Sequence, residues 1–493
     1  MRASANQHAL QFADGTPFFI IGDTWYSLGT NRFRWYEDDN ERPIGPAAGF
    51  KDYVRYRKMQ GYNWINVIAA FPNWITDGKS WHLVMDDSAK TTVRSAWLEF
   101  GTGSAKNMDN EGGRPFFFPG KVPGYENEFP DMDRINPKYF KYLDRKIDYL
   151  NANGFVPFIE VSRRDAGLCW HKYYDWPDSY VRFIQYIFSR YQANNTVLSP
   201  IHLDIIDETV SPDDYTTAIH FMEKKFGPPP FGTLLSANAN PSTLENWGED
   251  SWVTLHQIGN MREHNNYWYL TEIFNLKNPK PALNGEPYYA GYRDARGPGS
   301  ANYTRGAAGG SERDNAFVRS GMYGSFISGG LAGHVYGAEG IWGADIEPTA
   351  PVHMWDAFQW KSGAEMQYLK TFAFSIGRRY QELVPLADLV SPNKTRETLS
   401  YEGWAYCART DDKQVFLAYF EKGCPPSQIR GARLNSIYRA QWFNPREGTW
   451  MNVGTGKLAS NKIGILTLPD FPGDSDWGLR LIYEGRESGK ILN

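Results

Sequence analysis

The chain alternates short apolar segments with longer segments in which apolar residues recur every three or four positions. Short apolar runs are typical of buried strands, and the longer spacing is typical of amphipathic helices, so their alternation predicts a parallel sheet covered by helices. Eight strands are predicted, at residues 17–23, 62–70, 155–162, 196–204, 231–238, 251–259, 279–286 and 331–337. Helical spacing predicts helices at 50–61, 137–154, 178–191, 213–227, 262–274 and 313–330.

Eight repeats of this kind predict an α/β fold of the closed (β/α)₈ barrel type, also called a TIM barrel. A doubly wound open sheet is the alternative. That fold often carries a glycine-rich phosphate loop after its first strand, whereas this chain has GDTWYSLG at residues 22–29. The sequence therefore favours the barrel.

The pattern changes at about residue 381, where short alternating segments separated by turn residues are typical of an antiparallel β-sandwich. Because a single core stops growing at roughly 250 to 300 residues, a chain of 493 residues is expected to form two domains. We assign residues 1–380 to the barrel and residues 381–493 to the smaller sandwich. Trp404 and Trp442 lie in alternating strand patterns, which favours a buttress for the barrel over a glycan-binding module. The segment 71–135 is too long for an ordinary connection and is interpreted as an insertion that forms a lid or pocket wall.

The charge balance excludes some partners. The chain has 52 basic and 56 acidic residues and a formal net charge of −4, without the cationic stripe that nucleic acid requires. No apolar run approaches the roughly 20 residues that span a bilayer. The first residues, MRASANQHAL, lack the basic and apolar segments of a secretory signal. A periplasmic or secreted protein whose signal has been removed is favoured over a cytoplasmic one, and the oligomeric state stays open.

Cysteines and aromatic residues refine this picture. Cys169, Cys407 and Cys424 have neither the spacing of a zinc site nor the density of a disulfide scaffold. Free buried thiols are predicted, with a Cys407–Cys424 disulfide as the alternative. The 18 tryptophans and 30 tyrosines mostly belong to the core, but such rings also suit the apolar faces of sugars.

Polar and aromatic residues follow the ends of the predicted strands, where a barrel of this class has its active site. We expect substrate contacts from Asp23, Trp25, Asn66, Trp74, Arg163, His202, His256, Gln257, Tyr288, His334, Tyr336 and Trp342. Glu160 and Ser162 also end a strand. The histidines show no HExxH motif and no Cys/His pair at ligand spacing, so hydrogen bonds to a sugar hydroxyl or a core carbonyl are favoured, and no metal or cofactor is predicted.

Two carboxylates stand out, because glycoside cleavage needs an acid for the leaving oxygen and a base or nucleophile for the anomeric carbon. Asp204 ends the predicted strand 196–204, and Glu286 ends the strand 279–286. Asp207 and Glu208 are rivals of Asp204 as the acid. For Glu286, the alternative is a buried carboxylate paired with arginine.

The chain resembles the apiosidase-like glycoside hydrolases over about residues 10 to 493. The motifs that carry the resemblance are FFIIGDTWY, GYNWINVI, INPKYFKYLDRKIDYLNANGFVPFI, RY followed by VLSPIHLD, PKPALNGEPYY and GHVYGAEGIW. The resemblance implies a (β/α)₈ barrel followed by a β-sandwich, with Asp204 as the acid/base and Glu286 as the nucleophile. Gly285 would admit a close backbone approach, and Pro287 would stiffen the turn.

Two departures from the family pattern limit what is carried over. IHLD stands where paired glycines usually precede the acid, which adds the bulk of His202 and Leu203, and NGEP lacks the aspartate that often precedes the glycine. Apiose specificity is therefore not implied. Four arginines near the expected pocket would suit an acidic or sulfated sugar: Arg163, Arg164, Arg293 and Arg305.

The sequence thus predicts a glycoside hydrolase, exo-acting and retaining, that cleaves a terminal or side-chain sugar from a complex polysaccharide or oligosaccharide. The first alternative is a non-catalytic carbohydrate-binding protein on the same scaffold. The second is a metal-dependent hydrolase that uses His202 and His334. These alternatives differ in their expected response to removal of the carboxylates and to chelation.

Overall fold

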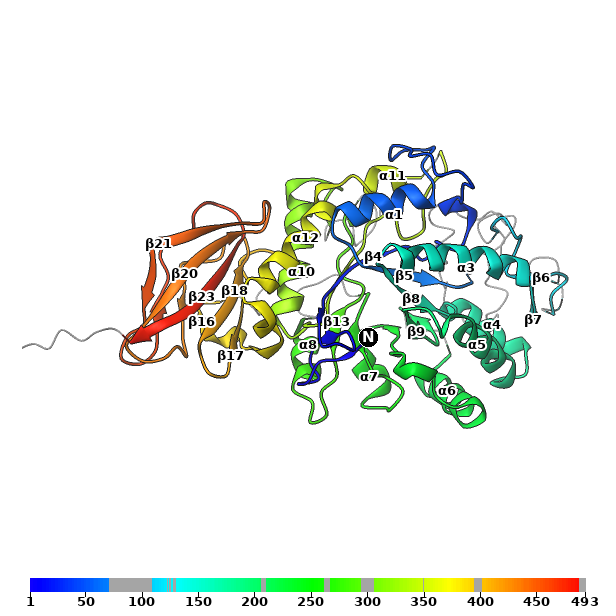
Figure 1. Cartoon of the computed structure of the whole chain (residues 1–493), viewed down its shortest axis with the longest axis horizontal. Coiled ribbons are helices and arrows are strands. Elements are labelled where there is room, and N and C mark those ends of the chain that lie inside the picture. Colours follow the sequence, from blue (N-terminus) through cyan, green and yellow to red (C-terminus); the bar gives the residue numbers. More distant parts are fainter. Residues whose placement is uncertain are drawn as a thin grey trace, which may run out of the picture.

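A computed structural model describes residues 1–70, 109–121, 123, 126, 130–204, 210–260, 267–293, 306–348, 350–393 and 401–486, without the side chain of Asp165. A barrel of strands and helices is followed by a β-sandwich that lies beside it (Figure 1). Most of the predicted insertion, residues 71–108, lies outside the described residues.

Seven strands of the barrel form one parallel sheet, in the order β12-β13-β14-β4-β5-β8-β9. They are β4 (Ile20–Thr24), β5 (Trp64–Ile68), β8 (Val156–Glu160), β9 (Val197–Ser199), β12 (His256–Ile258), β13 (Ala282–Asn284) and β14 (Gly333–Tyr336). Its two edge strands, β9 and β12, follow each other along the chain apart from one irregular strand between them. The sheet is therefore curled into a barrel that this irregular strand closes. The predicted barrel is thus observed.

The irregular member is the fifth strand. It closes the gap between β9 and β12 through hydrogen bonds from Leu198 N to Leu234 O at 3.1 Å and from Leu255 N to Leu235 O at 3.1 Å. Regular pairing is limited to β11 (Asn238–Ala239), which lies parallel to β10 (His202–Leu203). The prediction of a full strand at 231–238 is therefore wrong, because three prolines precede it and Pro230–Gly232 forms a 3₁₀ turn.

Helices cover the outside of this sheet (Figure 1). They are α1 (Phe50–Met59), α3 (Pro137–Ala152), α4 (Arg164–Tyr173), α5 (Asp178–Tyr191), α6 (Pro212–Phe226), α7 (Thr243–Trp247), α8 (Tyr267–Phe274), α10 (Glu312–Ile327), α11 (Met354–Ala357) and α12 (Lys361–Phe374). Four of these helices, α4, α7, α11 and α12, were not predicted from the sequence. Both α4 and α12 start without a side-chain cap, so the usual signal for a helix start is absent.

Two small antiparallel pairings flank the barrel. One is a three-stranded sheet at the beginning of the chain, formed by β1 (Arg2–Ala3), β2 (Leu10–Gln11) and β3 (Pro17–Phe18). The other pairs β6 (Phe116–Phe117) with β7 (Asp131–Ile135).

The interior of the barrel is apolar at one level and polar above it. Ile20, Trp64, Phe158, Leu283 and Val335 belong to one buried cluster. Side chains on a strand alternate between the two faces, so the residues two positions further along, such as Glu160 after Phe158, also point inward. These inward polar side chains lie at the carboxyl ends of the strands and form the floor of the candidate site.

The C-terminal sandwich consists of a six-stranded and a three-stranded antiparallel sheet. The larger contains β15 (Leu383–Pro385), β17 (Ala405–Thr410), β18 (Val415–Phe420), β23 (Trp477–Arg486), β20 (Ser436–Asn444) and β21 (Thr449–Ala459); the smaller contains β16 (Val390–Ser391), β19 (Gln428–Ile429) and β22 (Leu466–Thr467). Cys169, Cys407 and Cys424 are all free and buried, as predicted.

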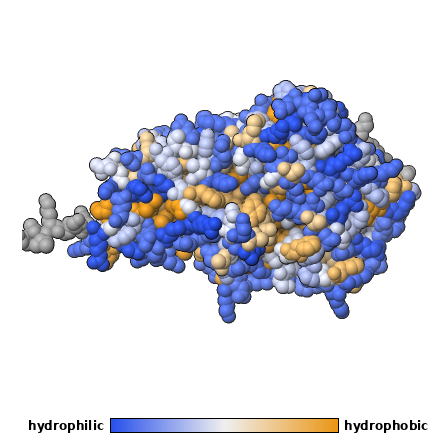
Figure 2. Space-filling view, in the orientation of Figure 1, coloured by the Kyte–Doolittle hydropathy of each residue, from blue (hydrophilic) through white to orange (hydrophobic). Residues whose placement is uncertain are grey.

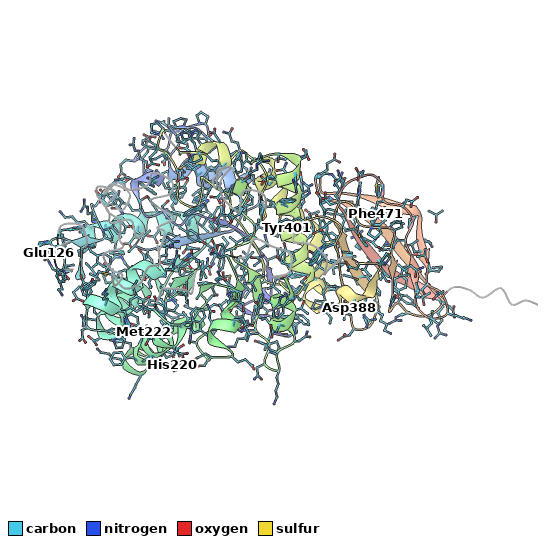
Figure 3. The ribbon with its side chains drawn as sticks, turned by 180° about the vertical axis from the view of Figure 1, so that it is seen from behind. Glu126, His220, Met222, Asp388, Tyr401 and Phe471 are labelled. Atoms are coloured by element: carbon cyan, nitrogen blue, oxygen red, sulfur yellow. The ribbon has the colours of Figure 1, made fainter. Side chains whose placement is uncertain are left out.

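The sandwich packs tightly on the barrel. Tyr323 of α10 stacks on Tyr419 of β18 with ring centroids 4.8 Å apart. Tyr401 lies where α10 meets the sandwich (Figure 3), and its ring is 4.6 Å from that of Phe317 and 5.4 Å from that of Tyr288. Residues of both parts belong to one buried hydrophobic cluster, so the contacts are those of a buttress.

Hydrophilic residues cover most of the face in Figure 2, where hydrophobic residues form small separate areas. In the described part of the chain, no helix has the length and apolar character to cross a membrane.

Candidate active site

Glu286 lies in a tight turn after β13, at the carboxyl edge of the barrel. A Cβ atom on Gly285 would lie 1.8 Å from Oε1 of Gln257, so a larger residue here would displace the Gln257 side chain. The close neighbour is a side chain and not the backbone that the sequence led us to expect. The Tyr289 hydroxyl donates a hydrogen bond of 3.0 Å to Oε1 of Glu286. The residue is 4% exposed, which leaves the carboxylate oriented and almost shielded from solvent.

The neighbouring tyrosine, Tyr288, points elsewhere. Its hydroxyl donates to Oδ1 of Asp314 on α10 at 2.8 Å and accepts from the backbone N–H of Ala307 at 3.1 Å. Tyr288 was predicted to contact the sugar; the structure instead gives the contact with Glu286 to Tyr289. The reason is that successive residues of the turn project in different directions.

Asp204 follows β10 and is held by two guanidinium groups. Arg163 donates from Nη2 to Oδ2 at 3.1 Å, and Arg164 donates from Nη1 to Oδ1. The side chain amides of Asn240 and Asn260 donate to its backbone carbonyl. Two adjacent positive charges favour the ionised form of this carboxylate, and the residue is 7% exposed.

A third carboxyl group, Glu160 at the end of β8, lies beneath the other two. Nδ1 of His202 is 3.0 Å from its Oε2, and Nε2 of the same ring is 3.6 Å from Oδ1 of Asp204. Among the described residues, its Oε1 has no hydrogen-bond partner. Both Glu160 and His202 are buried, so the imidazole joins two carboxyl groups away from solvent.

Burial sets the protonation of this pair. It raises the pKa of Glu160 well above its usual value, and the negative charge of Glu286 adds to the rise. Burial also lowers the pKa of His202 well below its usual value, with further lowering by Arg163 and Arg164. Both shifts favour the neutral forms, a carboxylic acid facing a neutral imidazole, over a buried ion pair.

Tyr26, two residues after β4, connects the two halves of the site. Its ring packs edge-on against that of His202 with centroids 4.7 Å apart. Its hydroxyl lies 3.4 Å from the Tyr289 hydroxyl and accepts from Nδ2 of Asn238 at 2.9 Å. A continuous path of contacts therefore joins Asp204 to Glu286 through His202, Tyr26 and Tyr289.

Gly259 provides a second link. A Cβ atom there would lie 2.9 Å from Oδ1 of Asn238 and 3.4 Å from Cβ of Glu286. Asn238 and Glu286 are therefore neighbours on either side of this glycine. Its small size lets the end of β12 approach β11. This brings together the side chains that come from the fourth, fifth and seventh strands of the barrel, which are Asp204, Asn238 and Glu286.

Three residues predicted to contact substrate instead fix strands to the helical ring. Nε of Arg57, on α1, donates to Oδ2 of Asp23 at 2.6 Å, and Nε1 of Trp25 donates to the same oxygen at 2.9 Å. The Tyr336 hydroxyl lies 3.1 Å from the Ser362 hydroxyl on α12. These side chains occupy the outward face of their strands, which corrects the prediction for Asp23, Trp25 and Tyr336.

The histidines on the sixth and eighth strands are also buried. Nδ1 of His256 is 2.8 Å from the Thr243 hydroxyl, and burial, with a small effect of Lys280, lowers the pKa of His256 to about 3. Burial lowers the pKa of His334 to about 3 as well. The side chain of His256 is fully buried, so it presents no surface for the predicted sugar contact. Within the ranges that the structure describes, no group of three His, Cys, Asp or Glu side chains is arranged to hold a metal ion.

The remaining predicted contacts are internal to the barrel or lie at its edge. Gln257 donates to the Ser236 hydroxyl at 2.8 Å, and Oδ1 of Asn66 accepts from Nε1 of Trp64 at 2.6 Å. Nε1 of Trp342 donates to Oε2 of Glu339 at 2.8 Å. Four residues considered earlier lie outside the described residues: Trp74, Asp207, Glu208 and Arg305.

Glu160 was predicted only to end a strand, and Tyr26 and Tyr289 were not among the predicted substrate contacts. Glu160 ends a strand as Asp204 and Glu286 do, and this position was the available signal. Nothing in the sequence distinguishes Tyr26 from Trp25, or Tyr289 from Tyr288, because the facing of adjacent residues is fixed only by the folded turn.

Comparisons with known proteins agree with this architecture. The family model described as "Apiosidase-like, catalytic domain" matches residues 4–377. A solved structure titled "Glycoside hydrolase" is 16% identical, with a TM-score of 0.65 and coverage of 98% of this chain and 96% of that chain. A glycoside hydrolase family 5 structure from Bacteroides vulgatus ATCC 8482 is also 16% identical, with a TM-score of 0.65 and coverage of 100% and 94%. Among curated proteins, none matches the chain.

Proposed function

Because the chain belongs to the apiosidase-like family and is a glycoside hydrolase, we propose that it is exo-acting and retaining, with Glu286 as the nucleophile and Asp204 as the acid/base. The substrate is a terminal or side-chain sugar on a complex polysaccharide or oligosaccharide. The observation that carries this proposal is the path of contacts that joins Asp204 to Glu286 at the carboxyl edge of the barrel.

The nucleophile role rests on orientation. A retaining glycosidase needs an ionised carboxylate aimed at the anomeric carbon. The hydrogen bond from Tyr289 fixes Oε1 of Glu286, and the glycine before it holds the turn against Gln257. Because proximity and orientation contribute much of the rate of such a reaction, this rigid turn supports Glu286 as the attacking group.

The acid/base role rests on position and on polar support. Asp204 comes from the strand-four segment, and its backbone carbonyl is fixed by two asparagine amides. The two guanidiniums that hold its side chain favour the ionised form, which suits the step in which a base removes a proton from water. They disfavour the protonated form, so the acid step needs a proton supply.

The identity of the sugar is not proposed to be apiose. His202 and Leu203 replace the small residues that usually precede the acid in similar sequences, and the His202 ring is packed against Glu160 and Tyr26 rather than solvent. The larger side chains of His202 and Leu203 fill space below Asp204. We expect a different terminal sugar from that of the family name.

A panel of aryl glycosides with 4-nitrophenyl and 2,4-dinitrophenyl leaving groups, together with plant, algal and microbial polysaccharides, tests the function. We expect one glycoside to be cleaved with release of product of retained anomeric configuration, observed by ¹H NMR during the first turnovers. Product with inverted configuration would refute the nucleophile role of Glu286.

Variants assign the residues. Glu286→Ala should abolish turnover of the active glycoside and regain activity with azide, giving a glycosyl azide of inverted configuration. Asp204→Ala should keep activity on the 2,4-dinitrophenyl glycoside, where no acid is needed, and azide should then yield the azide of retained configuration. Asp23→Asn is the matched control, because Asp23 is also a buried aspartate bound by arginine at a strand end. Azide rescue of that control, or none in the other two, would contradict the assignment.

Two alternatives give other outcomes. A carbohydrate-binding protein would retain a bound glycan in affinity electrophoresis without cleaving any member of the panel. A metal-dependent hydrolase would lose activity on dialysis against EDTA and regain it with a divalent cation.

A further inference from the structure

The site holds a carboxylate that must deliver a proton and a second carboxyl group that stores one. Asp204 is held by Arg163 and Arg164, whose charges favour its ionised form. Glu160 lies in the barrel interior, fully buried, where a charge is costly. The proposed acid therefore lacks the proton that the chemistry requires, while a neighbouring group retains one.

His202 is placed to connect them. Its Nδ1 is 3.0 Å from Oε2 of Glu160, and its Nε2 is 3.6 Å from Oδ1 of Asp204. The ring is held by the edge of Tyr26 at a centroid distance of 4.7 Å. Because the two ring nitrogens of imidazole are separate sites, one can accept a proton while the other releases one.

We propose that Glu160, His202 and Asp204 share one transferable proton, which resides on Glu160 in the resting enzyme and reaches Asp204 through His202 when the leaving oxygen is presented. This inference rests on the proposed acid/base role of Asp204. Glu160 and His202 act through Asp204 and do not touch the sugar, so they are positioning residues.

The transfer balances in both halves of the reaction. The Oε2–H bond of Glu160 breaks as an Nδ1–H bond forms on His202, and the Nε2–H bond breaks as an Oδ1–H bond forms on Asp204. Asp204 then gives that proton to the departing oxygen, and Glu160 is left as a carboxylate. When water attacks the glycosyl-enzyme, its proton passes from Asp204 back through His202 to Glu160, and the imidazole returns to its first tautomer.

The charged and titratable groups around this chain of atoms are consistent with storage on Glu160. They are Arg163, Arg164, Glu286, Asp204 and Tyr26. Burial and the charge of Glu286 raise the pKa of Glu160, whereas the two arginines favour an ionised Asp204. The proton is therefore more stable on the buried carboxyl.

The first test measures the resting tautomer directly. The chain has nine histidines, so protein labelled with ¹⁵N only at histidine gives a resolvable set of ring signals, and His202→Asn assigns the one of interest. We expect a neutral ring between pH 5.5 and 8.5 with the proton on Nε2 and an unprotonated Nδ1. A proton on Nδ1 would place an ionised Glu160 beside it and would overturn the proposal.

The second test uses Glu160→Gln, which keeps the size of the side chain but has no transferable proton. With a 4-nitrophenyl or alkyl glycoside, whose departure needs acid assistance, kcat/KM should fall by about 10²-fold or more. With the 2,4-dinitrophenyl glycoside of the same sugar it should change by less than about threefold, because that leaving group departs as an anion. The alkaline limb of the profile for the poorer leaving group should move to lower pH, since Asp204 holds a proton less well than Glu160 does.

A control and a second variant separate this role from a structural one. Glu421→Gln alters another buried glutamate, bound by Ser320 and the backbone N–H of Trp404. It should leave kcat/KM unchanged for glycosides with either leaving group. His202→Asn should reproduce the leaving-group dependence of Glu160→Gln, and the double variant should be no worse than either single one. Equal losses of kcat/KM with both leaving groups would show that Glu160 only supports the fold. No loss with either would show that the reaction does not use a proton held by Glu160.

The two tests distinguish the failure of this inference from the failure of the function. If no glycoside is cleaved by the wild-type protein, the proposed function falls, and the tautomer of His202 alone decides whether the proton resides on Glu160. If glycosides are cleaved but the leaving-group dependence is absent, the function stands and the proton sharing falls.

Discussion

Asp476 is the carboxylate through which the sandwich is tied to the barrel. It lies directly before β23 and is buried. Arg319 of α10 donates to it from Nε at 2.7 Å and from Nη2 at 2.9 Å, and Arg446 donates from Nη1 at 3.0 Å. The Tyr419 hydroxyl adds a hydrogen bond of 2.8 Å. We expect Asp476→Asn to lower the free energy of unfolding of the whole protein at neutral pH.

The size of this loss of stability follows from the lowered pKa of Asp476. Burial by itself would raise the pKa of Asp476, but Arg319, its hydrogen bonds and Arg446 outweigh burial and lower the pKa from 3.8 to about 2. Because a tenfold change in proton affinity is about 1.4 kcal/mol, the ionised carboxylate stabilises the folded protein by about 2 to 3 kcal/mol. The folded pKa is the lower one, so this contribution is present above a pH of about 4 and is lost as the pH falls towards 2.

Urea unfolding followed by tryptophan fluorescence at several pH values between 7 and 3 measures this contribution. At pH 7 the variant should be less stable by at least about 2 kcal/mol, and by up to about 5 kcal/mol because the buried Arg319 loses one of its two carboxylate partners and the half-buried Arg446 loses its partner. The difference should shrink below pH 4. Asp474→Asn, two residues earlier and largely exposed, is the matched control and should show no measurable loss. A difference that stays constant from pH 7 to pH 3 would refute the ionic origin of the junction.

Three further changes test the packing of the site. Tyr289→Phe removes the donor that orients Glu286, and kcat/KM should fall by about 10- to 100-fold with little change in unfolding free energy; an unchanged kcat/KM would contradict the orienting role. Gly285→Ala places a methyl group against Gln257 and should destabilise the protein by about 1 to 3 kcal/mol, measured by thermal unfolding, whereas a neutral effect would mean that the turn is not tight. Asp23→Asn leaves the buried guanidinium of α1 without its carboxylate, and should cost about 3 to 5 kcal/mol of stability without any azide rescue in the activity assay.

Most of the barrel could be predicted because its strands are buried on both faces and read as short continuous apolar runs. The helix predicted at 178–191 coincides with α5, β5 and β8 lie within their predicted ranges, and β4 ends one residue beyond its predicted range of 17–23. The fifth strand could not be predicted correctly, since its pairing consists of a few backbone hydrogen bonds to β9 and to the residues before β12. Such pairing depends on neighbours that are distant in sequence and leaves no local pattern.

The candidate site could be predicted only as a set of strand ends. Asp23 and Glu160 each lie at the carboxyl end of a strand, yet Asp23 binds Arg57 on the outer face and Glu160 points into the barrel with His202. A displacement of one residue along a strand reverses the face of every side chain. Continuous apolar runs do not show which alternate residues point inward, so the sequence could not separate these two acids.

The inward position of Glu160 matters chemically because it places Glu160 beside His202. In the motif that the chain shares with similar sequences, glycine usually stands at this position, and a glycine has no side chain that could join Glu160 to Asp204. The imidazole is held between them at 3.0 Å and 3.6 Å, while two arginines bind Asp204 and their charges favour its ionised form. An acid held in this way needs a proton source, and the proposed store on Glu160 makes the histidine and the arginines parts of one arrangement. Under the proposed proton sharing, the residue at which this chain departs from the family motif is the one through which Asp204 obtains its proton.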